Sequence, residues 1–330
     1  MVTGLPRNDG SGLPSDRRGQ LLLVGALVIA LVIVVLAMVV NTVLFTENAG
    51  AERVSAEVEG VDEFAFQAGK TSRSILLRVN HGTHDRSVDQ LQENVTRSIA
   101  GYDDALARSH VMSGTTYVNV SYNRTFHNGT RIVQSEDGNF TSPHATPGVD
   151  WSVISSGDET DVGWFLLNVN LRNTTAGHAW INVTGRSEEL DFRMNRSDGG
   201  DGTNLSLAVY NSSTDLDSVN CTSSGGRVLL DIYAGTGSSE GCSFTGIDEY
   251  LGPRYDVSVA DGDNVAGKYS IVTNSTWNAS FASFDRCRAT SADPVCRSPV
   301  VWNGSVDLTY QSPTVQYTQQ RNVTVYGEGS

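Results

Sequence analysis

Residues 21–40 read LLLVGALVIALVIVVLAMVV, twenty side chains without a charge or a strong hydrogen-bonding group. At a rise of about 1.5 Å per residue, a helix of this length spans the roughly 30 Å hydrocarbon core of a bilayer. Soluble domains rarely contain an uninterrupted apolar run of this length. The run therefore predicts a single transmembrane helix that begins at Leu21, ends near Phe45 and contacts membrane lipid.

The charges on either side of this run predict its orientation. Arg7, Arg17 and Arg18 precede it, whereas acidic residues outnumber basic ones over residues 46–60. Basic flanks of membrane helices tend to remain in the cytoplasm. We therefore expect a cytoplasmic leader over residues 1–20, a single pass through the cell membrane and an extracellular remainder. No second long apolar run follows, which argues against a multi-pass channel or transporter built from this chain alone.

The junction before the apolar run carries a possible processing signal. Arg17-Arg18-Gly19-Gln20 leads directly into the run, and this arrangement resembles the class III signal of archaeal type IV pilins and archaellins. The resemblance is confined to the N-terminal segment that holds this junction and the helix. It implies cleavage after Gly19, so that Gln20 begins the mature chain and the apolar helix is retained. Val24 stands at the fifth mature position, where many pilins carry an acidic residue.

Two other fates of the leader are compatible with the sequence. Arg17-Arg18 also resembles part of a twin-arginine export signal, although Gln20 occupies a position where that signal prefers an apolar residue. Ala49-Gly50-Ala51 fits the A-x-A pattern of a conventional signal-peptide cleavage site. The apolar run is longer than the roughly 7 to 15 residues usual in such a peptide, which favours retention of the helix.

The chain is acidic, with a formal net charge of −14 from 23 basic and 37 acidic side chains. Affinity for nucleic acid depends on Lys and Arg that neutralise phosphates, so this balance argues against a nucleic-acid partner. Lys70 and Lys268 are the two lysines among the 23 basic residues. This composition, with many carboxylates and almost no lysine, is similar to that of proteins from salt-loving archaea. A high net charge of this kind keeps a protein soluble.

A helical stalk is expected over residues 46–112. From Val54 to Val79 apolar residues recur in steps of three and four, which is typical of an amphipathic helix or a short coiled coil. Residues 80–83 interrupt the pattern, and a second stripe begins at Val88. Two helices joined by a short loop can bury their stripes against each other. The stalk would be a spacer that packs against its own outer domain or, as in pilins, a long helix that packs against neighbouring copies of the chain.

Residues 113–330 predict a β-rich extracellular domain. Short runs rich in β-branched and aromatic residues alternate with Gly, Asn, Asp and Ser, and no helical segment of a dozen residues separates them. The fold class is therefore α+β, with a transmembrane helix and helical stalk followed by an antiparallel, sandwich-like domain. The loop at residues 197–203 is expected to separate two sub-sheets. Candidate strands occupy residues 115–122, 164–171, 179–183, 205–210, 228–233, 255–259, 269–273, 306–310 and 323–326.

The outer segment is rich in N-x-S/T sequons, fifteen of them after Phe45. Sequon asparagines accept glycans on exposed surfaces outside the cytoplasm, so this excess predicts an exported glycoprotein. Asn94 lies on a predicted helix and is therefore left out of the predicted sites. The predicted glycosylation sites are Asn119, Asn123, Asn128, Asn139, Asn173, Asn182, Asn195, Asn204, Asn211, Asn220, Asn274, Asn278, Asn303 and Asn322.

Cys221, Cys242, Cys287 and Cys296 all follow the membrane helix. An even number of cysteines in an oxidising compartment predicts disulfides. Nearest-neighbour pairing is one of three possible connectivities. A zinc site is the less favoured interpretation, because no C-x-x-C pair occurs.

One hydrolase pattern occurs in the outer segment. Residues 237–241 read GSSEG and match G-x-S-x-G, with Ser239 as the nucleophile, after a predicted strand. A nucleophile elbow needs a helix directly after the serine, whereas the residues that follow are typical of a loop. The pattern also requires a later histidine, and none occurs after His178. We therefore predict no catalytic residue.

Two further patterns suggest metal ligands and are judged insufficient. His81 and His84 have the spacing of a helical metal pair, but a glycine lies between them and no nearby carboxylate completes a site. Residues 261–264, DGDN, begin like a calcium loop that fails at Val265 and Val272. A turn between two strands is the favoured interpretation there. No metal ion and no cofactor is predicted.

These observations predict a single-pass, membrane-anchored surface glycoprotein with a structural or adhesive role, of which a pilin-like subunit is one form. The alternative is an extracellular binding or assembly module that does not polymerise. A secreted hydrolase is the least favoured class. The expected partners are membrane lipid and either further copies of the chain or other surface proteins.

Overall fold

The computed structural model describes residues 16–82, 87–113, 116–142, 150–154, 160–197, 203–212, 214–252, 254–276, 284–288 and 295–327 of the 330-residue chain. Within the first helix, the side chains of residues 16–29, 31 and 40–57 lie outside this description. The chain divides into two compact units, Met1–Asp62 and Glu63–Ser330. The boundary between them falls among the residues predicted to form the stalk.

Helix α1, Asp16–Gly82, includes the predicted membrane span and the first half of the predicted stalk. Among the side chains that the structure describes, no helical stretch has both the length and the apolar character needed to cross a bilayer. Most side chains of the predicted span, residues 21–45, lie outside the described set, so the membrane helix stays a prediction. Helix α1 ends at Gly82, where the sequence predicts a break, and helix α2, Val88–Ser113, follows.

Ser87 fixes the start of α2. Its Oγ accepts a hydrogen bond from Gln90 N at 3.2 Å, and Gln90 Oε1 accepts one from Ser87 N at 2.8 Å. This reciprocal pair is a capping box, which satisfies backbone N–H groups that the first turn of a helix leaves unpaired. The pattern Ser-x-x-Gln therefore determines locally where the second helix begins.

Two antiparallel sheets form most of the second unit. The larger sheet has the strand order β13-β12-β1-β11-β3-β8-β9, and the smaller one has the order β2-β10-β4-β5-β6-β7. Each ladder between neighbouring strands is antiparallel, which confirms the predicted fold class for this part of the chain.

The bounds of these elements are β1 Tyr117–Asn139, β2 Trp151–Ile154, β3 Val162–Asn170, β4 Ala179–Thr184, β5 Glu189–Arg196, β6 Asn204–Asn211, β7 Thr214–Thr222, β8 Arg227–Asp231, β9 Thr236–Gly237, β10 Asp256–Ala260, β11 Ala266–Thr273, β12 Val295–Gln311 and β13 Gln316–Thr324. The short helix α3, Ile247–Tyr250, follows β9, and the 3-10 turn η1, Gly262–Asn264, joins β10 to β11.

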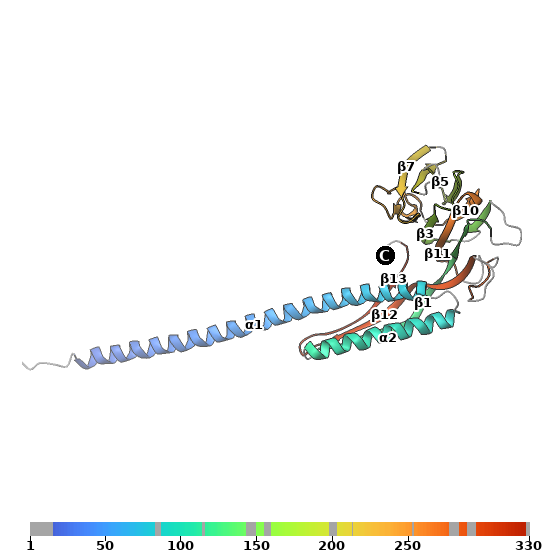
Figure 1. Ribbon diagram of the computed structural model, residues 1–330. Coiled ribbons are helices and arrows are strands. Elements are labelled where there is room, and N and C mark those ends of the chain that lie inside the picture. Colours follow the sequence, from blue (N-terminus) through green and yellow to red (C-terminus); the bar gives the residue numbers. More distant parts are fainter. Residues whose placement is uncertain are drawn as a thin grey trace, which may run out of the picture. The chain divides into compact units, whose positions relative to one another are not determined.

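The longest ladder in the molecule joins β1 to β12. Residues 117–122 pair with residues 306–311, and residues 126–134 pair with residues 295–304. The register shifts between these halves, where Arg124 has a positive φ of 59°. Strand β13 extends the sheet mainly beside the first half, and β11 extends it beside the second. In Figure 1, β1 accordingly passes from the level of the helices into the level of β11 and β3.

The second half of the ladder belongs to a sandwich with one hydrophobic core between the two sheets. The core side of each strand follows the period of two. In β5, for example, Leu190, Phe192 and Met194 have no exposed surface, whereas Asp191 and Arg193 between them are partly exposed. Alternate residues therefore separate a dry interior from a polar outer face, as the sequence pattern predicts.

Helices α1 and α2 lie against the first half of the ladder. Helix α2 packs on β1 and β12, and its residues Leu91, Val95 and Ile99 are at most 1% exposed. In α1, the ring of Phe64 lies 5.7 Å from that of Tyr310 in β12. An open groove of about 610 Å³ runs between the two helices. Part of both apolar stripes is therefore buried against the sheet as well as between the helices.

Arginine side chains add polar ties between α1 and the end of β13. Arg73 Nη2 donates a hydrogen bond to Val325 O at 3.1 Å, and Arg321 Nη1 donates one to Ala65 O at 2.9 Å. A Cβ atom on Gly69 would lie only 2.7 Å from Arg321 Cζ. Gly69 therefore allows the guanidinium group to reach the helix backbone, and α1 continues through this glycine without a break.

Asn80 completes the attachment of α1 to the sheet. Its side chain has no exposed surface; Nδ2 donates to Val301 O at 2.8 Å, and Oδ1 accepts from Val301 N at 2.9 Å. The β12–β13 ladder reaches only as far as Asn303. The amide of Asn80 therefore takes the place of a strand at this position of β12, and it satisfies both backbone groups in a dry environment.

The predicted strand ranges match part or all of most strands but miss β2, β5, β7 and β9. In β5 and β7 the Asp, Glu and Asn residues have low strand propensity, although the apolar alternation along β5 is regular. The prediction for residues 197–203 is wrong. Strands β5 and β6, on either side of this loop, pair directly with each other in the smaller sheet. A polar, glycine-rich connection of this kind joins the two strands of a hairpin and does not mark a sheet boundary.

We predict that Asn80→Leu lowers the free energy of unfolding by about 2 to 4 kcal/mol, because it leaves the N–H and C=O of Val301 buried without partners. Ser72→Ala serves as the control on the same face of α1. The Ser72 hydroxyl is buried and has no hydrogen-bond partner among the described residues, so its removal should be neutral or stabilising. Urea unfolding of the full chain in detergent measures both values. Equal losses from the two substitutions would contradict this account.

Candidate functional site

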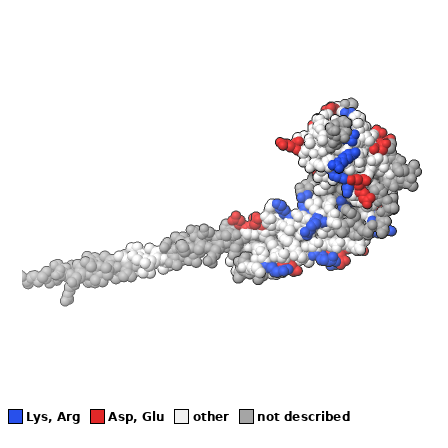
Figure 2. Space-filling model, viewed as in Figure 1, with Lys and Arg blue, Asp and Glu red and all other residues white. Residues whose placement is uncertain are grey.

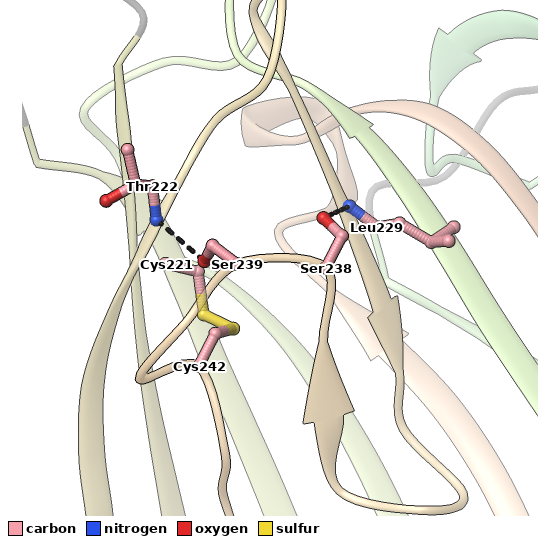
Figure 3. Close-up of a disulfide and its surroundings, with 6 residues drawn as sticks. All are labelled: Cys221, Thr222, Leu229, Ser238, Ser239 and Cys242. Atoms are coloured by element: carbon pink, nitrogen blue, oxygen red, sulfur yellow. Dashed lines mark hydrogen bonds between the residues drawn. A yellow bond between two sulfur atoms is a disulfide. The ribbon is translucent and has the colours of Figure 1, made fainter.

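The disulfide between Cys221 and Cys242 closes one edge of the sandwich. Cys221 lies in β7, the last strand of the smaller sheet, and Cys242 follows β9, the last strand of the larger one. Both cysteines are buried, and Figure 3 shows the bond between the two chain segments. A disulfide of this loop length typically stabilises a fold by roughly 2 to 4 kcal/mol. The bond therefore holds together two sheet edges that no backbone ladder joins.

Ser239 lies in the turn that carries this disulfide. Its Oγ accepts a hydrogen bond from Thr222 N at 3.1 Å, and the neighbouring Ser238 Oγ accepts one from Leu229 N at 3.2 Å (Figure 3). The two hydroxyls thus tie the turn to β7 and β8. The next helix begins only at Ile247. This is not the strand–turn–helix geometry of a nucleophile elbow, so the structure gives the G-x-S-x-G residues a role in the turn.

The second disulfide joins Cys287 to Cys296, which lies in β12. With Val133 of β1 these cysteines form a small buried cluster apart from the main core. Both bonds follow the nearest-neighbour connectivity, one of the three that the sequence leaves open. Each therefore closes a short loop, of 21 and 9 residues respectively, and fixes it to a sheet.

The predicted glycosylation sites lie at the surface. Asn278 lies outside the described residues, and none of the other thirteen predicted asparagines is buried. Asn80, the fully buried asparagine that holds β12, is not part of a sequon. Exposure of the acceptor is necessary for attachment of a bulky glycan, so the described sites meet the first physical requirement.

The hydrogen bonds of the sequon asparagines divide them into two groups. Asn182 Nδ2 donates to Asp191 Oδ1 at 2.6 Å, and Asn274 Nδ2 donates to Asp161 Oδ2 at 2.9 Å. A glycan replaces one hydrogen of the side-chain amide that it is attached to. Attachment at Asn182 or Asn274 therefore disturbs the hydrogen bond from that amide to the neighbouring carboxylate. Exposed sites such as Asn139, Asn173 and Asn220 have no side-chain hydrogen bond among the described residues. Attachment of a glycan there breaks no hydrogen bond.

The outer face of the smaller sheet also carries an aromatic pair, Trp180 and Tyr210, with a cation close to both rings. The Arg193 guanidinium lies 5.6 Å from the Trp180 ring centre and 5.3 Å from that of Tyr210. These three residues come from β5, β4 and β6. Cation–π contacts of this kind order a long side chain on an exposed sheet face.

The other residues singled out from the sequence either make contacts within the fold or lie outside the described residues. Gly19 and Gln20 fall within α1, but their side chains are not among those described. His81 forms a hydrogen bond of 2.9 Å with the Tyr326 hydroxyl, and its ring lies 5.2 Å from that of Trp164. His84 lies outside the described residues. His81 is therefore part of an aromatic cluster at the end of α1.

Residues 261–264 form the turn between β10 and β11 that the sequence favours. Asp261 adopts a left-handed conformation, and the 3-10 turn η1 follows it. Asn264 connects this turn to the β3–β4 loop, because its Oδ1 accepts from Thr175 Oγ1 at 2.7 Å and its Nδ2 donates to His178 O at 3.0 Å. Over the described residues, no group of three or more His, Cys, Asp or Glu side chains is placed to hold a metal ion.

Burial perturbs two carboxyl groups of the sandwich. It raises the pKa of Asp231 above the usual 3.8, although the N–H groups of Ala234 and Tyr233 donate to the carboxylate and favour its ionised form. Burial likewise raises the pKa of Asp191, which the hydrogen bond from Asn182 opposes. In both cases the loss of solvation is the larger effect.

A cavity that the sequence did not reveal lies at one end of the sandwich and is called the end cavity below. Its volume is about 230 Å³. It lies where β3 and β10 begin and β13 ends. Because its lining comes from segments scattered between residues 161 and 327, no local motif indicates it. The lining residues are Asp161, Val162, Tyr233, Asp248, Leu251, Tyr255, Trp302, Thr324, Tyr326 and Gly327.

Comparison with known proteins gives one family match. The model of DUF7261, described as a family of unknown function, matches residues 15–183. This stretch contains the whole of α1 and α2, the first three strands and all but the last residue of β4. No curated protein and no solved structure matches the chain.

We predict that glycan occupancy follows the hydrogen bonds of the sequon amides. Asn139, Asn173 and Asn220 should be occupied more fully than Asn182 and Asn274, because their amide groups are exposed and not bound to a carboxylate. Mass spectrometry of glycopeptides from the protein purified from its native host measures each site. If Asn182 and Asn274 were fully glycosylated while Asn173 and Asn220 carried no glycan, hydrogen bonding of the amide would not control occupancy.

We predict that Asp231→Asn stabilises the fold at neutral pH relative to the unchanged chain. The raised pKa of Asp231 means that the folded state binds more protons than the unfolded state at pH values just above 3.8, so stability falls as pH rises through this range. The Asn side chain keeps an acceptor for the two N–H groups but has no charge to desolvate. Thermal melts at pH 3 and pH 7 test this. The expected gain in melting temperature is larger at pH 7, and a gain confined to pH 3 would contradict burial as the cause.

Proposed function

Because this chain belongs to DUF7261, a family of unknown function, we propose its role from its own residues: a membrane-anchored glycoprotein of the cell surface that crosses the membrane once. Its role is structural, on the plan of a pilin subunit, with one N-terminal apolar helix and a β-rich outer domain. The anchor is residues 21–45, the leader before it is cytoplasmic, and the second unit is extracellular.

The observation that carries this proposal is the exposure of an apolar stretch in α1. The described large side chains between residues 32 and 39 are all more than half exposed. Such a stretch is stable only in contact with lipid or with other apolar helices. These residues are Val32, Ile33, Val34, Val35, Leu36, Met38 and Val39, with exposed fractions of 51 to 66%.

Features of the second unit support an extracellular location. Its four cysteines form two disulfides, which persist in oxidising compartments. Its described sequons are at the surface, where a glycosyltransferase reaches them. On the face that Figure 2 shows, acidic and basic residues are interspersed and form no broad basic surface. This distribution supports a partner other than nucleic acid.

A non-polymerising binding or assembly module is the second candidate. One observation favours it over a filament subunit: residues 63–82 of α1 are already bound to the chain's own sheet through Asn80, Arg73 and Arg321. The face that holds these contacts is therefore not available to neighbouring copies. In either case the membrane anchor and the outer domain keep the same roles.

We predict that the mature protein, extracted from membranes of its native host, begins at Gln20. The variant Gly19→Val should retain residues 1–19, because the proposed peptidase cuts after a glycine. Gly12→Val is the control, since it alters the leader without touching the junction, and it should be cut normally. Intact-mass measurement of the three proteins gives the result directly.

Two outcomes would overturn parts of the proposal. A mature chain that starts at Met1 or Glu52 would remove the pilin-like plan. Protease added to intact cells should digest the second unit, and its survival would remove the extracellular location. Electron microscopy of the cell surface then distinguishes a filament subunit from a module that stays single.

A further inference from the structure

The end cavity is acidic. Asp161 and Asp248 are the charged residues among those that line it, and its described lining includes no Lys, Arg or His. An opening with this charge attracts cations and repels anions, the more so where low-dielectric walls concentrate the field. The two lining carboxylates thus favour a cation over phosphate, sulfate or a carboxylate, although the Arg73 guanidinium, which donates to Thr324 O at 3.3 Å, lies next to the lining.

The carboxylate of Asp161 is held in place by its own protein. Oδ1 accepts a hydrogen bond from Arg254 N at 3.0 Å, and Oδ2 accepts one from Asn274 Nδ2 at 2.9 Å. In return, Asp161 N donates to Asn274 Oδ1 at 2.8 Å. A carboxylate oxygen can accept two hydrogen bonds, so each oxygen of Asp161 can still accept one from a ligand. A charged acceptor fixed in this way loses little conformational entropy on binding.

Two of the three tyrosine hydroxyls of the lining donate to the protein, and the third, that of Tyr326, is hydrogen-bonded to His81 Nε2 at 2.9 Å. Tyr233 OH donates to Asp248 Oδ1 at 2.7 Å, and Tyr255 OH donates to Leu251 O at 3.3 Å. These donors orient the walls, whereas the carboxylates have accepting capacity to spare. The ligand that best complements this lining is one that donates hydrogen bonds and carries positive charge.

Aromatic rings supply the rest of the wall, and they are closely packed. Trp302 and Tyr326 have ring centres 5.7 Å apart, and Tyr326 is only 1% exposed. A Cβ atom on Gly163 would lie 2.6 Å from Trp302 Cη2 and 2.7 Å from Tyr326 Cβ. The absence of a side chain at Gly163 thus lets both residues pack closely against β3. Trp and Tyr rings offer an apolar surface against which an alkyl chain can pack.

We propose that the end cavity binds a small organic cation, with a primary ammonium or guanidinium group at Asp161 and Asp248 and its carbon chain against Trp302 and Tyr326. The volume of about 230 Å³ admits such a group with a short alkyl chain. The cation comes either from a free small molecule or from a Lys or Arg side chain of another protein. The inference does not depend on the membrane anchor or on filament formation.

Calorimetric titration of the full chain in detergent at constant low ionic strength tests the proposal. The probes are butylammonium chloride, butylguanidinium chloride and a short peptide with one central lysine, with 1-butanol and glucose as neutral comparisons. The two cations should bind, and the neutral compounds should not. Asp248→Asn should weaken cation binding by about threefold to tenfold, since it removes a partly solvated charge partner.

The variant Asp263→Asn is the matched control, because it makes the same charge change at an exposed position in η1 and should leave binding unchanged. Asp248 is also exposed, so its substitution leaves the core intact. Stronger binding of the lysine peptide than of butylammonium assigns the cavity to a protein side chain, and the reverse assigns it to a free amine. Binding of glucose or butanol, equal weakening by both variants, or no binding of any cation would overturn the proposal.

Discussion

The pairing of β1 with β12 is the constraint on which the second unit depends. One half of this ladder carries α2 and the end of α1, and the other half forms part of the sandwich. Two strands far apart in sequence therefore connect regions that otherwise share few contacts. Formation of this ladder closes a long loop, whose entropic cost is offset only when both the helices and the sandwich pack against it.

Polar contacts define where α1 sits on the sheet, although apolar burial supplies most of the stabilisation. The apolar stripe of α1 could slide along a flat sheet with little loss of buried area. The two hydrogen bonds of Asn80 to Val301 fix one position, since any shift would leave buried backbone groups without partners. The close approach of Arg321 to Gly69 fixes a second. Together they determine both the position and the direction of the helix.

The edges and the end of the sandwich carry different features of the molecule. The disulfide of Cys221 and Cys242 holds the 237–242 turn against the edge strand β7, where the Ser239 hydroxyl accepts a hydrogen bond from Thr222 N. Covering an edge strand in this way hinders edge-to-edge aggregation. The exposed sequons are compatible with a glycan cover over the strands. The end cavity lies at the rim, where strands begin and end and where side chains from several segments converge. This is the usual position for a binding function on a β-sandwich.

Features that depend on local or periodic patterns can be read from the residues alone. The stripe from Val61 to Val79, the break at Gly82 and the alternation along β6 follow from periods of 3.6 and two, which any packed helix or strand must satisfy. Strands β5 and β7 were missed, because their Asp, Glu and Asn residues have low strand propensity.

Only the tertiary structure decided which distant segments meet. The choice of Val301 as the partner of Asn80, the surface on which both helical stripes are buried and the convergence of Asp161, Asp248 and Trp302 are set by the register of non-local ladders. Register depends on the simultaneous fit of many side chains across sheets, and no single segment of the chain contains that information.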